Sequence, residues 1–193
     1  MSKPVRRRGL ILDRDGVINE DTGYLHRIEE CRFVDGIFEM VAAFQARGFV
    51  TVIASNQSGI GRGLYSESDF AHFMTWMRWE FARRKVPVAA VYHCPDHPTE
   101  GIGPYCRANP WRKPGPGMLQ QAAWDLDLDL RKSWTVGDRA SDVEAGRAAG
   151  VGTIVQYDPL APAVRRCDDF WLVPRLAAVT ELLAQQEEGG GQW

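Results

Sequence analysis

The sequence predicts an α/β protein built on a Rossmann-like, doubly wound parallel sheet. Short apolar, β-branched segments recur along the chain, helical patterns lie between most of them, and glycine follows two of those patterns. Strands that alternate with helices are typical of a parallel sheet covered on both faces. The expected strands are residues 9–13, 49–55, 88–93, 133–136 and 151–157, and the expected helices are residues 36–47, 66–85, 116–126, 141–149 and 174–186.

The helices carry their own signals. Gly48 and Gly150 stand just past two of them, where glycine commonly closes a helix in the left-handed conformation. The helix over residues 66–85 is rich in large apolar side chains at helical spacing, which predicts a buried packing face or a subunit contact and not a cofactor site. These side chains are Phe70, Phe73, Met74, Trp76, Met77, Trp79 and Phe81.

The length of 193 residues fits one domain, since a chain of this size can bury a substantial core. We expect that domain over residues 1–186 and a disordered tail over residues 187–193, which are charged and glycine-rich. Residues 95–116 are rich in proline and glycine and show little periodicity. They are expected to form a long loop, and long loops in compact domains are usually functional or disordered.

The formal net charge is −2, with both signs mixed along the chain. Such a balance predicts neither nucleic acid nor an anionic membrane as a partner, so a small soluble substrate is expected. The basic start is followed by an apolar run too short for a secretion signal, and no stretch is long enough to span a membrane. Scattered cysteines favour a reducing cytoplasm, and a monomer is the simplest expectation. The cysteines are Cys31, Cys94, Cys106 and Cys167.

Two carboxylates, Asp13 and Asp15, follow the first strand. Their spacing places both on one face of an extended chain while Arg14 points away, and Gly16 permits a sharp turn. A carboxylate at the carboxyl end of a strand can act as a nucleophile that forms an aspartyl-phosphate. The second carboxylate could protonate the leaving oxygen. The alternative is an ordinary solvated turn, since aspartate and glycine dominate turns.

Two later loops offer groups that bind phosphate. In residues 55–63 a hydroxyl, an amide and the backbone N–H groups of a glycine-rich turn can converge on phosphate oxygens. Arg112 and Lys113 stand just before a helix, and both cations suit phosphate. The first loop could be a plain turn, and the cations could be solvated surface charges.

An acidic loop follows the fourth strand. Asp138 could complete an oxygen shell for Mg²⁺ with the side chain of Asp13 and the backbone carbonyl of Asp15. Asp142 either caps the following helix or holds a metal-bound water. All four polar segments thus stand at strand carboxyl ends, in the order acid pair, hydroxyl loop, cation, acid. Their joint occurrence by chance is small.

These segments resemble the four motifs of the haloacid dehalogenase superfamily of aspartate-nucleophile phosphatases, over nearly the whole chain. The resemblance implies that Asp13 attacks phosphorus, that Asp15 is general acid and then base, and that Ser55 and Lys113 hold the phosphoryl group. It implies Mg²⁺ between Asp13, the Asp15 carbonyl and Asp138. Because the connection after the first strand is short, only loop caps are expected over the site.

The resemblance also implies a phosphorylated sugar, most closely a sugar bisphosphate, as substrate. Arg139 stands where the family commonly has lysine, so its charge is kept and its geometry differs. The implied substrate-binding residues are Asp21, Thr22, Gly23, Tyr24, Asn56, Gln57, Ser58, Arg112 and Arg139.

Zinc is the clearest departure from that family. Its members often carry Cys-x-His before the long loop and Cys-x-Cys before the Arg-Lys pair, a closed tetrahedral site. Here Asp96 stands at the histidine position, and Asn109 and Trp111 stand at the two later cysteine positions. A shifted zinc site remains open, because loop ligands need only the right geometry. Its ligands would be Cys94, His97 and Cys106, with His93 as a possible fourth.

Two other functions remain open at this point. A phosphatase for histidinol phosphate would use the same catalytic groups on a cationic substrate, but it would favour acidic groups near the leaving alcohol, whereas Arg112 and Arg139 favour a second anion. A phosphate-binding module without turnover would not need the second carboxylate, Asp15.

Overall fold

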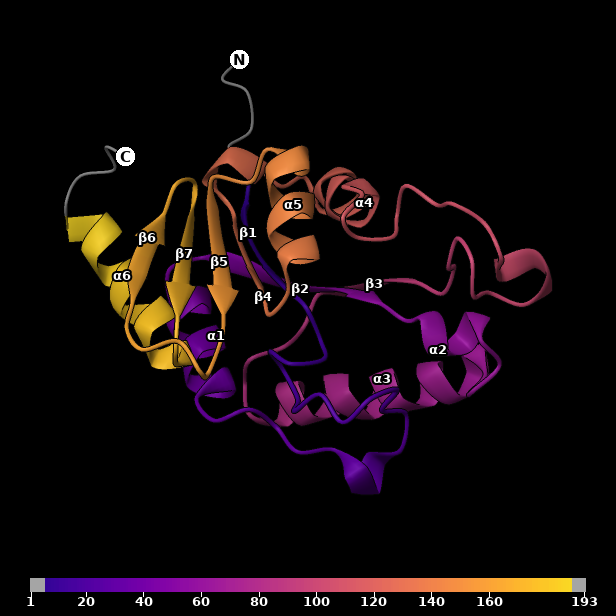
Figure 1. Ribbon diagram of the computed structural model, residues 1–193. Coiled ribbons are helices and arrows are strands. Elements are labelled where there is room, and N and C mark those ends of the chain that lie inside the picture. The colour runs from indigo at the N-terminus through magenta and orange to yellow at the C-terminus, as the bar shows by residue number, and fades with distance from the viewer. Residues whose placement is uncertain (1–5, 189–193) are drawn as a thin grey trace, which may run out of the picture.

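The computed structural model describes residues 6–188. Its centre is a seven-stranded sheet in the order β3-β2-β1-β4-β5-β7-β6 (Figure 1). All neighbouring strands are parallel except β6, which runs antiparallel to β7 at the edge. The strands are β1 (Arg8–Leu12), β2 (Phe49–Asn56), β3 (Ala90–Cys94), β4 (Trp134–Gly137), β5 (Thr153–Tyr157), β6 (Arg165–Cys167) and β7 (Phe170–Val173).

Every expected helix forms, within a few residues of its expected bounds. The helices are α1 (Ile37–Gln45), α2 (Ser58–Gly61), α3 (Glu67–Arg83), α4 (Gly117–Leu126), α5 (Ala140–Ala149) and α6 (Leu176–Glu188), with short 3-10 turns η1 (Ile28–Glu30), η2 (Gly103–Tyr105) and η3 (Leu130–Lys132). Gly150 caps α5 in the left-handed conformation, with φ of 74°.

Helix α6 runs further than its sequence pattern indicates. It includes Glu187 and Glu188, which were expected to begin a disordered tail. Glu187 is held there by Arg47, whose Nε lies 2.8 Å from its carboxylate, and by Arg8 at 3.3 Å. Local composition cannot reveal ion pairs with arginines that are distant in the sequence. The prediction of disorder was therefore wrong for Glu187 and Glu188. Residues 189–193 of the expected tail lie outside the described residues.

Alternation along β1 divides the core into two halves. Leu10 and Leu12 join the cluster packed by α1, α3 and α6, whereas Ile11 joins the cluster packed by α4 and α5. In Figure 1, α5 and α1 accordingly lie on opposite faces of the sheet. The doubly wound architecture therefore follows from strands that are apolar on both faces.

Helix α3 packs as its spacing predicts. Its five predicted phenylalanines and methionines are buried, Trp76 is partly buried, and Trp79 is 57 % exposed. The helix begins with a capping box in which Ser66 and Asp69 satisfy each other's backbone N–H groups. The packing prediction is thus confirmed, with Trp79 facing away from the core.

The strand order places the carboxyl ends of β1 and β4 side by side. In such sheets the order reverses at this point, and ligands bind in the crevice outside it. The connection from β1 to α1 contains only the 3-10 turn η1, so loops alone cover this edge. None of the helices within residues 6–188 is long and apolar enough to cross a membrane.

Candidate active site

A cleft of about 410 Å³ opens at the carboxyl ends of β1, β2 and β4. Parallel strands end at the same edge of a sheet, so residues far apart in the chain meet here. Twelve residues singled out from the sequence line it: Asp13, Asp15, Asp21, Gly23, Tyr24, Ser55, Asn56, Ser58, Arg112, Lys113, Arg139 and Asp142.

Asp13 and Lys113 form the floor of the cleft. The Lys113 ammonium lies 2.7 Å from Asp13 Oδ1, donates to the Ala54 carbonyl at 2.8 Å and contacts the Asp142 carboxylate. Burial opposes the charge of Lys113, but the two carboxylates outweigh burial and raise the pKa of its ammonium. Lys113 therefore stays cationic beside Asp13, a state that suits the binding of a phosphoryl oxygen.

Asn56 fixes the backbone of Lys113. Its side-chain amide donates to the Lys113 carbonyl at 2.9 Å and accepts from the Lys113 N–H at 3.0 Å. The expected role of Asn56 was contact with substrate. The structure shows it on the cleft wall with both ends of its amide engaged by Lys113.

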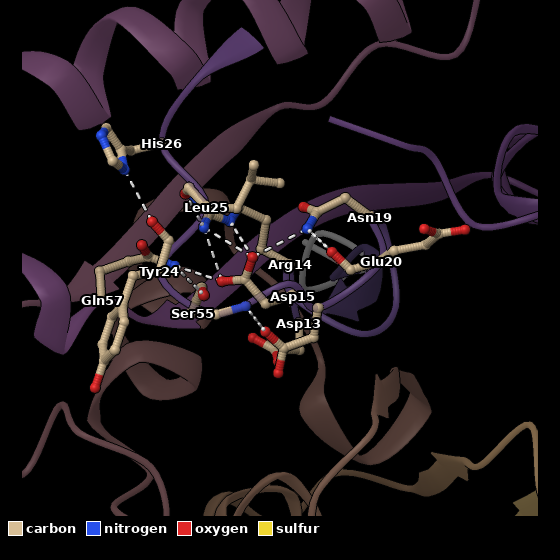
Figure 2. Close-up of polar contacts among 12 residues, drawn as sticks. Asp13, Arg14, Asp15, Asn19, Glu20, Tyr24, Leu25, His26, Ser55 and Gln57 are labelled. Carbon is tan, nitrogen blue, oxygen red and sulfur yellow. Dashed lines mark hydrogen bonds and ion pairs between the residues drawn. The ribbon is translucent and has the colours of Figure 1, made fainter. Parts of the chain in front are cut away.

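Asp15 is held by three side chains that all donate to it (Figure 2). Arg14 donates from Nε at 3.0 Å and from Nη2 at 2.8 Å, and Asn19 donates at 3.0 Å. Arg14 was expected to point away from this face, yet its guanidinium returns to Asp15. The reason is that β1 ends at Leu12, so strand alternation does not extend to Asp15.

Arg14 itself is fully buried. It also donates to the Leu25 carbonyl at 2.7 Å and lies over the Phe73 ring at 5.0 Å. Nη1 has no hydrogen-bond partner among the described residues, so the buried charge of Arg14 depends on its ion pair. The pair with Asp15 therefore fixes the first turn after β1 as much as it orients the carboxylate.

Gln57 is the third donor to Asp15, at 2.9 Å. The same amide nitrogen donates to Ser55 Oγ at 2.8 Å, and its oxygen accepts from the Tyr65 hydroxyl at 2.6 Å. Gln57 is only 2 % exposed and, like Thr22, does not line the cleft, although both were expected to bind substrate. Figure 2 shows Gln57 beside Ser55 and Asp15, where it orients both.

Three carboxylates converge at one side of the cleft. Asp13, Asp138 and Asp142 each place an oxygen within 4.8 Å of the others, and no other group of three potential ligands does so within residues 6–188. The Asp142 carboxylate also caps α5 by accepting from the Arg139 N–H at 3.1 Å. Asp142 was expected either to cap that helix or to hold a metal-bound water; here the capping residue also joins the cluster.

The carboxylate cluster fits Mg²⁺. Burial, together with neighbouring carboxylates, raises the pKa of Asp13 to about 7 and that of Asp138 to about 6, despite the nearby cations. Asp138 Oδ1 is buried without a hydrogen-bond partner. Gly16 makes room for Asp138, since a Cβ there would lie 2.3 Å from Asp138 Oδ2. An all-oxygen set with surplus negative charge is what a hard divalent cation requires.

The outer part of the cleft is cationic. Arg112, Arg139 and Arg62 line it, and burial, together with the charge of Arg62, lowers the pKa of Arg112. Arg139 donates to Asp21 at 2.7 Å, and Arg62 is paired with Glu100. Arg62 was not singled out from the sequence. Its position between Gly61 and Gly63, in the predicted phosphate-binding loop of residues 55–63, could have indicated that it lies at the cleft.

The possible zinc ligands do not converge. Cys94, His97 and Cys106 form no cluster within the part of the chain that the structure describes. His97 Nδ1 accepts from the Glu100 N–H at 3.0 Å, and Cys106 is exposed. Because tetrahedral zinc needs its ligands at one point, the shifted zinc site is not supported.

Comparisons with known proteins agree with this geometry. A family model described as HAD-hydrolase-like matches residues 110–156. A D-glycero-alpha-D-manno-heptose-1,7-bisphosphate 7-phosphatase of Burkholderia mallei is 51 % identical over 77 % of this chain and 79 % of its own length. The D-glycero-beta-D-manno-heptose-1,7-bisphosphate 7-phosphatase of Escherichia coli K12 is 37 % identical over 93 % and 95 %.

A solved structure adds the ligands. The D,D-heptose 1,7-bisphosphate phosphatase of B. bronchiseptica, complexed with magnesium and phosphate, superposes with a TM-score of 0.77 at 28 % identity, covering 93 % of this chain and 99 % of that chain. That protein therefore binds a divalent cation and phosphate on the same fold.

Proposed function

Since the chain belongs to the family of D-glycero-D-manno-heptose-1,7-bisphosphate 7-phosphatases, within the haloacid dehalogenase-like hydrolases, we propose that it removes the 7-phosphate of that sugar. It is a phosphoric monoester hydrolase that uses Mg²⁺. The contact of Asp13 with Lys113 at 2.7 Å, in a cleft whose outer part is cationic, is the observation that carries the proposal.

In the first step, a carboxylate oxygen of Asp13 attacks phosphorus, and the bond from phosphorus to the sugar oxygen breaks. Asp15 donates a proton to that leaving oxygen. Ser55 and Lys113 hold the oxygens of the transferring group, on which charge is concentrated. Asp15 then accepts a proton from the water that attacks the aspartyl-phosphate, which frees phosphate and restores Asp13.

Asp13, Asp138 and the backbone carbonyl of Asp15 would hold Mg²⁺, with Asp142 beside them. When bound, Mg²⁺ neutralises charge on the phosphoryl oxygens. Gln57, Asn19 and Arg14 keep the Asp15 carboxylate in place throughout. These three residues act by positioning and need not touch the substrate.

We propose that the second phosphate of the substrate binds Arg112, with Arg62 and Arg139 nearby. Arginine presents a planar fork that suits phosphate oxygens. The remaining cleft residues expected to bind substrate, among them Asp21, Gly23, Tyr24 and Ser58, would contact the sugar. The proposed second subsite is cationic, so it should disfavour the positively charged alcohol part of histidinol phosphate. Histidinol phosphate is therefore the contrasting substrate in the test.

The test is Mg²⁺-dependent phosphate release measured as kcat/KM. The substrates are both anomers of the heptose 1,7-bisphosphate, histidinol phosphate, a hexose bisphosphate and an aryl phosphate. We expect the heptose bisphosphate to be preferred by about 100-fold or more over histidinol phosphate and the aryl phosphate, because only a bisphosphate fills both charged subsites. The hexose bisphosphate tests the fit of the sugar. Equal, low rates on all of them would contradict the proposed substrate.

The protein is further proposed to be a cytoplasmic monomer that takes neither nucleic acid nor membrane as a partner. Its four cysteines are all free thiols, which suits a reducing compartment. Light scattering coupled to gel filtration tests the monomer directly, and a dimer mass would contradict it.

A further inference from the structure

The loop between β3 and α4 carries Arg112 and Lys113 to the cleft, although it has little structure of its own. Residues 95–116 contain only the 3-10 turn η2. A long loop without regular structure places its last residues reproducibly only if contacts within the loop hold its backbone.

Asp96 is the buried anchor of this loop. Its side chain is fully buried, and its Oδ2 accepts from Arg107 Nε at 2.8 Å and from Asn109 Nδ2 at 2.5 Å. Its backbone carbonyl accepts from Arg112 Nη1 at 3.3 Å. One residue at the start of the loop thus ties down three residues near its end.

Asn109 extends this link to the turn before the cations. While its amide nitrogen donates to Asp96, its oxygen accepts from the Trp111 N–H at 2.9 Å. The Arg112 N–H in turn donates to the Asn109 carbonyl at 3.0 Å. The Asp96 carboxylate therefore acts on the backbone of Arg112 through Asn109, whereas the Arg112 guanidinium is held by the Asp96 backbone carbonyl.

Arg112 depends on this anchor far more than Lys113 does. Lys113 is held by both ends of the Asn56 amide, by Asp13, by Asp142 and by the Ala54 carbonyl. Within residues 6–188, the Arg112 side chain has one hydrogen bond, the one to Asp96. That bond uses the backbone carbonyl, so loss of the Asp96 carboxylate should act by loosening the turn that carries Arg112, through Arg107 and Asn109, and should leave Lys113 in place.

Asp96 also stands at a position where members of the haloacid dehalogenase family often carry a zinc ligand. Asp96 occupies the position of the family's histidine, Asn109 occupies that of a cysteine, and the two bond to each other. The candidate zinc ligands Cys94, His97 and Cys106 form no cluster within residues 6–188. A carboxylate that accepts from an amide and a guanidinium can cross-link a loop without a metal.

We propose that Asp96 is a positioning residue that replaces a structural metal in this loop and orients Arg112 toward the second phosphate of the substrate. The role rests on the proposed function. It assigns no chemistry to Asp96, which lines no part of the cleft.

The test compares Asp96→Ala, Asp96→Asn and Cys106→Ser with the wild type on heptose 1,7-bisphosphate and p-nitrophenyl phosphate. Asp96→Ala keeps the backbone carbonyl and removes the carboxylate that fixes the turn. We expect KM for the bisphosphate to rise about 10- to 100-fold, the range of the one charge-assisted hydrogen bond from Arg112 to the second phosphate. Its kcat/KM on p-nitrophenyl phosphate should change by less than about twofold, because Lys113 keeps its own contacts. Asp96→Asn should be intermediate, and Cys106→Ser should match the wild type.

A double variant separates positioning from a general structural role. Asp96→Ala combined with Arg112→Ala should be no worse on the bisphosphate than Arg112→Ala alone, since both changes remove one interaction. Equal losses on both substrates would overturn the role. So would bound zinc at one equivalent together with a defect in Cys106→Ser. If Asp96→Ala does not fold, Asn109→Ala breaks the same link and serves in its place.

The two proposals fail differently. A wild type that does not prefer the bisphosphate over p-nitrophenyl phosphate overturns the proposed function and this role with it. A wild type that prefers the bisphosphate, with an unchanged KM in Asp96→Ala and Asn109→Ala, overturns the role of Asp96 alone.

Discussion

At the scale of single residues, chemistry and support are divided between neighbours. Asp13 contacts Lys113 and lies beside two further carboxylates, whereas Asp15 accepts from Arg14, Asn19 and Gln57. The first environment combines one cation with a carboxylate cluster that suits Mg²⁺, around the proposed nucleophile. The second fixes the direction of the carboxylate that is proposed to protonate the leaving oxygen.

Asp13→Asn tests the nucleophile. We expect kcat on an aryl phosphate to fall by at least about 10⁴-fold, because an amide cannot form the covalent intermediate. Far-ultraviolet circular dichroism should be unchanged. Asp125→Asn, on α4 and outside the cleft, is the matched control. Retained turnover in Asp13→Asn would refute covalent catalysis by this residue.

Arg14→Met tests the buried ion pair. Removing Arg14 leaves the Asp15 carboxylate without its charged partner, although Asn19 and Gln57 still donate to it, so the free energy of unfolding should fall by about 3 kcal/mol. Urea denaturation measures this. Arg27→Met, in the exposed pair with Glu30, should change stability by less than about 1 kcal/mol. Equal effects of the two substitutions would mean that burial of Arg14 does not matter.

At the scale of elements, α3 shows how local signals and tertiary contacts combine. Its capping box is readable from sequence, and its buried face follows from helical spacing. Its last turn carries a further contact, since Glu80 is buried and bonds to Arg83 and Arg84. Although burial opposes the charged form, hydrogen bonds from these arginines lower the pKa of Glu80.

Ser66→Ala removes the cap of α3. We expect a loss of about 1 kcal/mol in unfolding free energy, since the Asp69 N–H loses its acceptor. Chemical denaturation gives the value. Thr75→Ala, in the middle of the same helix, should have a smaller effect, because its hydroxyl bonds only the preceding turn. A larger loss for Thr75→Ala would argue against the cap.

Glu80 predicts a pH dependence of stability. A carboxyl whose folded pKa lies below its unfolded value stabilises the fold above the unfolded pKa, and this stabilisation is lost as pH falls through the folded pKa. Glu80→Gln should therefore cost on the order of 1 kcal/mol at pH 7 and progressively less in acid. Exposed Glu39→Gln on α1 is the control. A cost independent of pH would contradict the ion-pair account.

At the scale of the whole molecule, the sequence predicts the order of elements and most of the site. Five strands and five helices follow from periodicity, and Asp13, Ser55, Lys113 and Asp138 follow from their places after strands. The edge strand β6 and its neighbour β7 were not predicted. β6 is only three residues long and largely exposed, so it has no apolar pattern to detect.

The missed parts of the site share one physical cause. Arg62, the inward turn of Arg14, and the link from Asp96 to Asn109 depend on contacts between residues distant in space or on where a strand ends. Periodicity reports which face a residue occupies and not which partner it meets. The partner of a charged side chain is set by the tertiary fold.

The most direct measurement follows both phosphates of D-glycero-D-manno-heptose 1,7-bisphosphate by ³¹P NMR during turnover with Mg²⁺. The account predicts that the signal of the 7-phosphate is replaced by inorganic phosphate while the phosphate at position 1 is retained, and that a chelator stops the reaction. Loss of the phosphate at position 1, or release of both at equal rates, would contradict it.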